Sequence, residues 1–211
     1  MQHIIFDFDG TIANSSIVFM NGWNKFANQY RYLQVNEKDI QLARNMTIHE
    51  CAKKFNFPMY KMPIILPKIY GYFKQHIDEI SLYEGMKEAL MGLKEQGYNL
   101  YILSSNDKSN IESFLQLQQL DGIDEVLTSN KLFGKDHVLQ KFMKQRQIAA
   151  SDIFYIGDEL RDIKACNKCQ IDFGWASWGL HGYELIAKEN PKLLFDSPTH
   201  IVSQLRKEEI Y

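Results

Sequence analysis

Apolar and polar positions along this chain follow two patterns. Short apolar runs that end in a turn residue are typical of buried strands. Such runs cover residues 3–8, 98–103, 125–129, 153–158, 173–176 and 193–195. Apolar residues repeated at intervals of three and four predict helices over 86–96, 111–120, 137–146, 183–188 and 199–207, and one more that ends at Cys169. Strands that alternate with helices predict a parallel sheet with helices on both faces.

Residues 15–76 show helical periodicity without a convincing strand. The expected helices begin near Ser15, Asn36, Thr47 and Lys61. Thr47 is followed three residues later by Glu50, which is the spacing of a capping box. In the last helix Pro63 suits the first turn, whereas Pro67 could delay the start. We therefore expect an α/β core of residues 1–13 and 83–211, interrupted by an all-helical domain of residues 14–82.

Composition narrows the class of protein. The chain has 211 residues, 45% of them hydrophobic, which suffices for one sizeable core. With 24 basic and 26 acidic residues and no long basic run, nucleic acid is not an expected partner. No apolar run approaches the roughly 20 residues that span a bilayer, and charged residues near the start do not fit a signal peptide. We expect a cytoplasmic protein that contacts neither membranes nor an obligatory protein partner.

The cysteines agree with a reducing compartment. Cys166 and Cys169 form a C-x-x-C pair, but Cys51 is alone and no histidine pair lies nearby in the sequence. A zinc or redox site would need such additional groups. The apolar spacing around the pair instead predicts two small, core-facing residues of a helix.

Polar residues gather where the predicted strands end. Asp7 and Asp9 stand two positions apart at the end of the first strand, so their side chains can point to the same side. Neighbouring carboxylates repel each other, and a bound cation relieves that repulsion. A solvated turn is the alternative. Ser105, Asn106 and Asp158 also follow strands, and the carboxyl ends of parallel strands are where ligands bind.

Four segments in order resemble the motifs of the haloacid dehalogenase superfamily. They are Asp7-Phe8-Asp9-Gly10-Thr11, then Ser105-Asn106, then Lys135, and finally Gly157-Asp158-Glu159 with Asp162. The helical insert resembles the helical cap of that superfamily. Trp178-Gly179 and residues 194–198 look most like the branch that resembles phosphoglycolate phosphatases. The resemblance implies a Rossmann-like core, a parallel sheet with helices on both faces, plus an inserted all-α cap.

The resemblance also implies roles for these residues. Asp7 would be the nucleophile that forms an aspartyl-phosphate. Mg²⁺ would be held by an Asp7 carboxylate oxygen, the Asp9 backbone carbonyl and the Asp158 carboxylate. The Asp9 side chain would then transfer protons. Lys135 would offset the negative charge, and Asp162 would hold Lys135 or a metal-bound water. Phosphate-binding groups would come from Thr11, Ser105 and Asn106, and substrate contacts in the cap from Arg44.

Several assignments have an alternative. Thr11 and Asn106 could only shape turns, and Asp162 could be a surface residue of its helix. Glu159 could be a metal ligand or could support its loop. The nearby Lys131 competes with Lys135 for the same role. Arg44 could contact a substrate carboxylate or second phosphate, or it could be solvated.

The resulting functional hypothesis is a Mg²⁺-dependent phosphatase that hydrolyses the phosphate monoester of a small metabolite. A phosphomutase of the β-phosphoglucomutase type would use the same residues. A non-catalytic phosphate-binding protein on the same fold is the third possibility, although none of the expected catalytic aspartates is missing. A dehalogenase is disfavoured, because that chemistry needs neither Asp9 nor a metal.

Overall fold

The core is a six-stranded parallel sheet. A computed structural model describes residues 1–129 and 134–205. The strands lie in the order β5 (Glu125–Thr128), β4 (Asn99–Ser104), β1 (His3–Phe6), β6 (Ile153–Gly157), β7 (Asp172–Ala176) and β8 (Leu193–Phe195). Every neighbouring pair is parallel. The first strand is therefore central, which explains why its run of apolar residues is buried on both faces.

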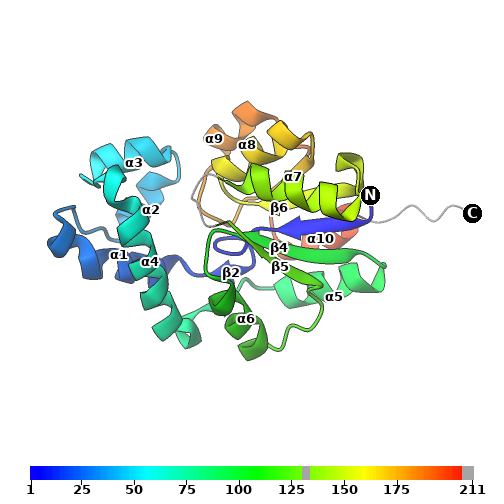
Figure 1. Ribbon diagram of the computed structural model, residues 1–211, viewed down its shortest axis with the longest axis horizontal. Helices are drawn as coiled ribbons and strands as arrows, with labels where there is room; N and C mark the ends of the chain where they lie inside the picture. Colours follow the sequence, from blue (N-terminus) through cyan, green and yellow to red (C-terminus); the bar gives the residue numbers. More distant parts are fainter. Residues whose placement is uncertain (130–133, 206–211) are drawn as a thin grey trace, which may run out of the picture.

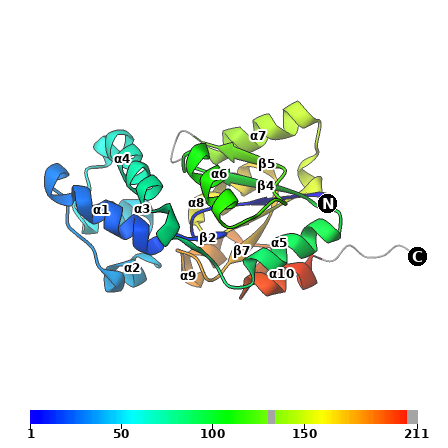
Figure 2. The ribbon, with the colours of Figure 1, turned by 90° about the horizontal axis from the view of Figure 1, so that it is seen from below.

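Helices cover both faces of this sheet (Figures 1 and 2). One face carries α5 (Met86–Glu95), α6 (Lys108–Leu117) and α10 (Pro198–Gln204). The other carries α7 (Lys135–Arg146), α8 (Leu160–Cys169) and α9 (Tyr183–Ile186). The described residues also form the short 3-10 helices η1 (Met59–Lys61), η2 (Ile77–Glu79), η3 (Ala150–Asp152) and η4 (Ala187–Glu189). Helices flank a Rossmann-like parallel sheet, as expected.

Alternation along β1 assigns side chains to the two faces. Ile4 and Phe6 pack in the same cluster as Phe114 of α6, whereas Ile5 packs with Leu139 of α7. All of these side chains are fully buried. Burying one such side chain stabilises the fold by about 1.5–3 kcal/mol, so this strand anchors both layers and fixes where its carboxyl end lies.

The helical insert leaves and re-enters the core through a short antiparallel ladder. β2 (Ala13–Asn14) pairs with β3 (Ser81–Leu82). Between them lie α1 (Ser16–Tyr30), α2 (Glu37–Ala43), α3 (Ile48–Lys54) and α4 (Met62–Gln75). Figure 1 places these helices at the end of the sheet away from the N-terminus. They enclose a separate apolar cluster that includes Tyr32, Phe57 and Ile65.

Local sequence signals explain most of the boundaries. The predicted capping box of Thr47 and Glu50 forms at the start of α3, and Asn36 and Asp39 form a second one at α2. Pro67 does not delay α4, which runs through it from Met62. Pro67 has no backbone N–H to donate to the Pro63 carbonyl, so α4 lacks that one intrahelical hydrogen bond but continues to Gln75.

One helix of the core starts earlier than the sequence predicted. α6 begins at Lys108, three residues before the expected start, because the Asp107 side chain accepts a hydrogen bond from the Ser109 backbone N–H and caps the helix. Cys166 and Cys169 are free, buried residues of α8, as predicted. Within residues 1–129 and 134–205, no helix is long and apolar enough to cross a membrane.

Candidate active site

The candidate site lies where the chain order of the sheet reverses. From β1 the chain continues through β4 to β5 on one side, then crosses to β6 on the other side of β1. Such a switch point opens a crevice at the carboxyl ends of the strands. Asp7 directly follows β1 and its backbone N–H donates to the Ile156 carbonyl at 2.8 Å. Asp158 directly follows β6, so the two predicted carboxylates come from neighbouring strands.

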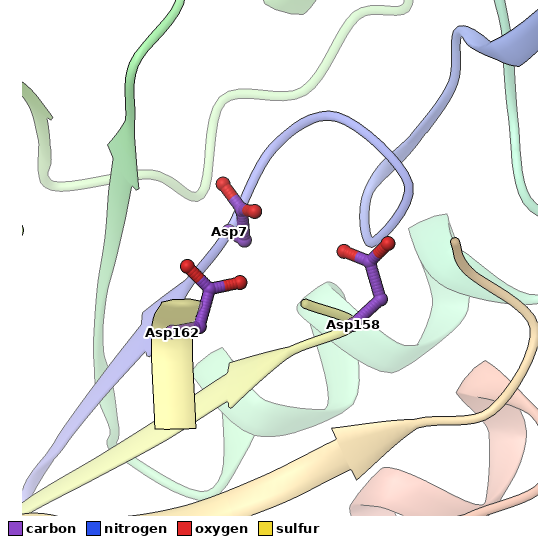
Figure 3. Close-up of side chains that lie close together, drawn as sticks. All are labelled: Asp7, Asp158 and Asp162. Atoms are coloured by element: carbon purple, nitrogen blue, oxygen red, sulfur yellow. The ribbon is translucent and has the colours of Figure 1, made fainter. Parts of the chain in front are cut away.

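Three carboxyl groups gather at this point. Figure 3 shows Asp7 at the end of β1, Asp158 after β6 and Asp162 at the start of α8. One oxygen from each lies within 4.8 Å of the others, and all three residues are buried. Asp7 Oδ2 is buried without a hydrogen-bond partner. An unpartnered buried carboxylate oxygen beside two further carboxylates fits a hard cation.

Asp158 is held tightly by its surroundings. Its Oδ1 accepts a hydrogen bond from the Thr11 hydroxyl at 2.8 Å, and its Oδ2 accepts one from the Leu180 backbone N–H at 2.7 Å. Gly10 and Gly179 line the carboxylate, since a Cβ on either would lie within 2.5 Å of an Asp158 atom. Burial, followed by the charge of Asp7, raises the pKa of Asp158 well above its usual range. A cation would reverse that effect.

Lys135 lies between two of the carboxylates. Its Nζ is 2.8 Å from Asp7 Oδ1 and 2.6 Å from Asp162 Oδ1, and it donates to the Tyr155 hydroxyl at 3.0 Å. Burial lowers the pKa of Lys135, but the charges of Asp162 and Asp7 outweigh it and raise the pKa. The alternative, Lys131, lies outside the described residues.

The Asp9 side chain is held apart from these three carboxylates. Its Oδ1 accepts a hydrogen bond from Ser15 at 2.8 Å, and its Oδ2 accepts one from the Asn106 amide at 3.0 Å. Burial, reinforced by the charge of Asp7, raises the pKa of Asp9 to about 6. Such a carboxyl group can both donate and accept a proton near neutral pH.

The Asn106 backbone N–H is also engaged, because it donates to the Ser104 hydroxyl at 3.0 Å. The residues predicted to bind phosphate thus have different surroundings. Thr11 contacts Asp158, and Asn106 orients Asp9. Ser15 stands at the predicted start of a helix, but its side chain makes no capping hydrogen bond. Its hydroxyl donates to Asp9 instead.

An arginine that the sequence analysis did not single out enters the site beside Ser105. Arg161 Nη1 donates to the Ser105 hydroxyl at 2.7 Å. Its Nε and Nη2 bind the two Glu159 oxygens at 2.8 and 2.7 Å. Both carboxylate oxygens of Glu159 are therefore paired with the Arg161 guanidinium. The only sequence signal was the position of Arg161 between two motif acids, where a helix start usually carries solvated residues.

The cap closes onto the site at several points. The Arg44 guanidinium donates to the carbonyls of Gly179 and Ser177, the latter at 3.0 Å. Asn110 of α6 donates to the Tyr70 carbonyl of α4 at 3.1 Å. The Tyr70 hydroxyl interacts with the Ser105 side chain, and burial raises the pKa of Tyr70. These two contacts engage Nη1 and Nη2 of Arg44 with backbone carbonyls of the core.

Acidic side chains outnumber basic ones around the three carboxyl groups. The acidic and basic side chains of the site within the described chain are Asp7, Asp9, Asp158, Glu159, Asp162, Lys135 and Arg161. Five carboxylates thus face two cations. The acidic side chains offer only oxygen atoms as metal ligands. Magnesium and calcium prefer oxygen ligands, whereas the softer transition metals prefer nitrogen or sulfur.

Known proteins are similar in sequence to this chain over nearly its whole length. A phosphoglycolate phosphatase of Synechococcus elongatus is 26% identical over 99% of this chain and 100% of its own. The pyrophosphatase PpaX of Bacillus cereus is 23% identical, covering 94% of each chain.

Solved structures agree in fold. A haloacid dehalogenase-like family hydrolase from Streptococcus pneumoniae superposes with a TM-score of 0.81 at 19% identity, over 97% of this chain and 98% of that one. A predicted phosphatase from Clostridium acetobutylicum reaches 0.82 at 20% identity, over 96% and 97%. The family model of haloacid dehalogenase-like hydrolases matches residues 4–176. The chain therefore belongs to the haloacid dehalogenase-like hydrolases.

Proposed function

We propose that this enzyme is a Mg²⁺-dependent phosphatase that hydrolyses small phosphate monoesters through an aspartyl-phosphate on Asp7. The observation that carries the proposal is the pairing of two aspartates with different surroundings. Asp7 lies against Lys135 with one oxygen unpartnered, whereas Asp9 is hydrogen-bonded and has a raised pKa. Two relatives whose names describe phosphatase or pyrophosphatase activity support the same reaction class.

The chemistry gives the two aspartates different roles. An oxygen of Asp7 attacks phosphorus while the bond to the leaving oxygen breaks, and Asp9 supplies the proton which that oxygen needs. Asp9 then accepts a proton from the attacking water, whose oxygen displaces Asp7 and releases inorganic phosphate. Lys135 offsets the negative charge on Asp7 and the phosphoryl group.

A divalent cation fits the remaining groups. We propose that Asp7, Asp158 and the Asp9 backbone carbonyl hold Mg²⁺, with Asp162 acting through Lys135, to which it is ion-paired. When bound, Mg²⁺ neutralises charge on the phosphoryl oxygens. Ser105 would donate its hydroxyl to the phosphoryl group. Thr11 and Asn106 would position Asp158 and Asp9, given the hydrogen bonds they make.

The broader organisation is also a proposal. Residues 14–82 would act as a cap over a core of residues 1–13 and 83–211, and we retain Arg44 as a candidate substrate contact once the cap opens. A cytoplasmic location is inferred from the sequence alone. A phosphomutase is less well supported, because the named relatives are hydrolases of phosphate compounds.

Replacement of the nucleophile tests the proposal. Asp7→Asn should reduce phosphate release from aryl phosphates and phosphorylated metabolites by roughly 10³-fold or more in the presence of Mg²⁺. Asp172→Asn removes an exposed carboxylate on β7 and should leave turnover unchanged. Unchanged phosphate release by Asp7→Asn would overturn the assignment, and a strict requirement for a sugar bisphosphate would favour the phosphomutase.

A further inference from the structure

We propose that Arg161 is a positioning residue that makes the Ser105 hydroxyl a dedicated hydrogen-bond donor to the phosphoryl group. The inference rests on the proposed function, because it assumes that Ser105 meets phosphate. It goes beyond that function by assigning a role to the buried ion pair of Glu159 and Arg161, which no catalytic step above uses.

Arg161 sets the direction of the Ser105 hydroxyl proton. A serine hydroxyl can donate or accept, and its proton rotates to suit its neighbours. Arg161 has only donors, so the 2.7 Å contact from Nη1 to Ser105 Oγ makes the serine oxygen an acceptor on that side. The proton of Ser105 must then point elsewhere. A phosphoryl oxygen is an acceptor, so a hydroxyl fixed in this way matches it without reorganisation.

Glu159 fixes the orientation of the Arg161 side chain. That side chain is 11% exposed, as is that of Glu159. Glu159 binds Nε and Nη2 with two parallel hydrogen bonds of 2.8 and 2.7 Å, the bidentate geometry that a lysine cannot reproduce. Because this fork locks the plane of the guanidinium, Nη1 is directed at Ser105 rather than free to rotate. Glu159 is thus the anchor of the arrangement.

A residue of the cap also contacts Ser105. The Tyr70 hydroxyl, carried by α4, makes a hydrogen bond with the Ser105 side chain. Arg161 and Tyr70 therefore meet at the same hydroxyl, one from the core and one from the cap. When a phosphoryl oxygen accepts the Ser105 proton, Arg161 remains in position.

A double-mutant cycle on phosphate binding tests the proposal. The probe is inorganic phosphate, titrated by calorimetry into the Mg²⁺-saturated protein. Ser105→Ala and Arg161→Gln should each weaken binding by about 10- to 100-fold, the range for hydrogen bonds to charged groups. In the Ser105→Ala background, Arg161→Gln should add less than about a twofold loss, because the group it positions is gone.

Three further variants separate positioning from charge and from folding. Arg161→Lys keeps the charge but loses the fork, and it should weaken binding about as much as Arg161→Gln. The double variant Glu159→Gln/Arg161→Gln leaves no unpaired buried charge, so it should fold if Arg161→Gln alone does not. Arg146→Gln, which breaks an exposed 2.5 Å ion pair with Glu125, is the matched control and should bind phosphate normally.

The outcomes are distinct. Equal losses on Arg161→Gln with and without Ser105, or full rescue by Arg161→Lys, would overturn the positioning role and leave the phosphatase proposal intact. Failure of the native protein to bind phosphate, together with no phosphate release from any ester, would overturn both. Strong coupling between Ser105 and Arg161 with normal binding by Arg146→Gln is the supporting result.

Discussion

Gly179 shows how closely single residues are fitted around the candidate metal ligands. A Cβ built on it would lie 2.1 Å from Asp158 Cβ and 2.4 Å from Oδ2. Its backbone is not in the left-handed region, so a larger residue would fail here for lack of space alone. Any side chain must therefore displace Asp158 or the loop after β7.

We predict that Gly179→Ala weakens activation by Mg²⁺ by about 10- to 100-fold, the usual cost of disturbing the groups that hold a metal ligand. The measurement is the Mg²⁺ concentration at half-maximal phosphate release. Because the clash is local, the circular dichroism spectrum should stay native. A Mg²⁺ dependence equal to that of the native protein would mean that Asp158 does not need its present position.

Removal of the metal is a separate test. Five carboxylates against two cations favour a bound divalent ion at this site. Treatment with excess EDTA should abolish phosphate release, and excess Mg²⁺ should restore it. The same treatment should also lower the thermal midpoint, because an ion that binds only the folded state stabilises it. Full activity in EDTA would exclude the metal assignment.

Residues at strand ends could be predicted because parallel strands bring their carboxyl ends together. Asp7, Asp158 and Lys135 could be named in this way or by resemblance. Arg161 and Ser15 could not. Their partners, Ser105 and Asp9, come from other elements. No local sequence pattern indicates the direction of an arginine side chain at the start of a helix.

At the scale of elements, α4 offers a test of how helix propensity acts in the cap. Gly71 lies inside this helix, is exposed, and has no atom within 4 Å of a built Cβ. An alanine fits there without strain and costs less conformational entropy on folding.

Gly71→Ala should raise the free energy of unfolding by about 0.5–1 kcal/mol and the thermal midpoint by about 1–4 °C. Differential scanning calorimetry measures both. Phosphate release should not change, which makes this variant a control for Gly179→Ala. A lower midpoint would show that position 71 requires a glycine for a reason other than its contacts in this arrangement of α4.

Patterns of apolar residues predicted the six strands of the sheet because each strand is a short buried run. They did not predict the ladder of β2 and β3, since two residues per strand are too few to show alternation. They also placed the start of α6 too late. The N-cap at Asp107 was a better marker than the first apolar residue.

At the scale of the molecule, the closed cap raises the question of how substrate enters. Arg44 binds the carbonyls of Gly179 and Ser177, and the Gly182 backbone N–H donates to the Arg44 carbonyl at 2.8 Å. These contacts join the loop after α2 to the loop after β7. If they hold during turnover, substrate cannot pass between these loops. We therefore expect them to break and reform in each cycle.

A disulfide staple across this contact tests that expectation. A Cβ built on Gly182 lies 3.5 Å from Asn45 Cγ, one bond beyond Asn45 Cβ, which makes the pair a candidate for a disulfide, whose Cβ atoms lie about 3.5–4.5 Å apart. The variant Asn45→Cys/Gly182→Cys should lose most of its turnover on oxidation and regain it on reduction. Each single variant, treated with the same oxidant, controls for oxidation of Cys51, the half-buried native cysteine. Oxidised protein that is fully cross-linked yet turns over at the native rate would show that substrate enters without this movement of the cap, and the contacts of Arg44 would then be a permanent part of the fold.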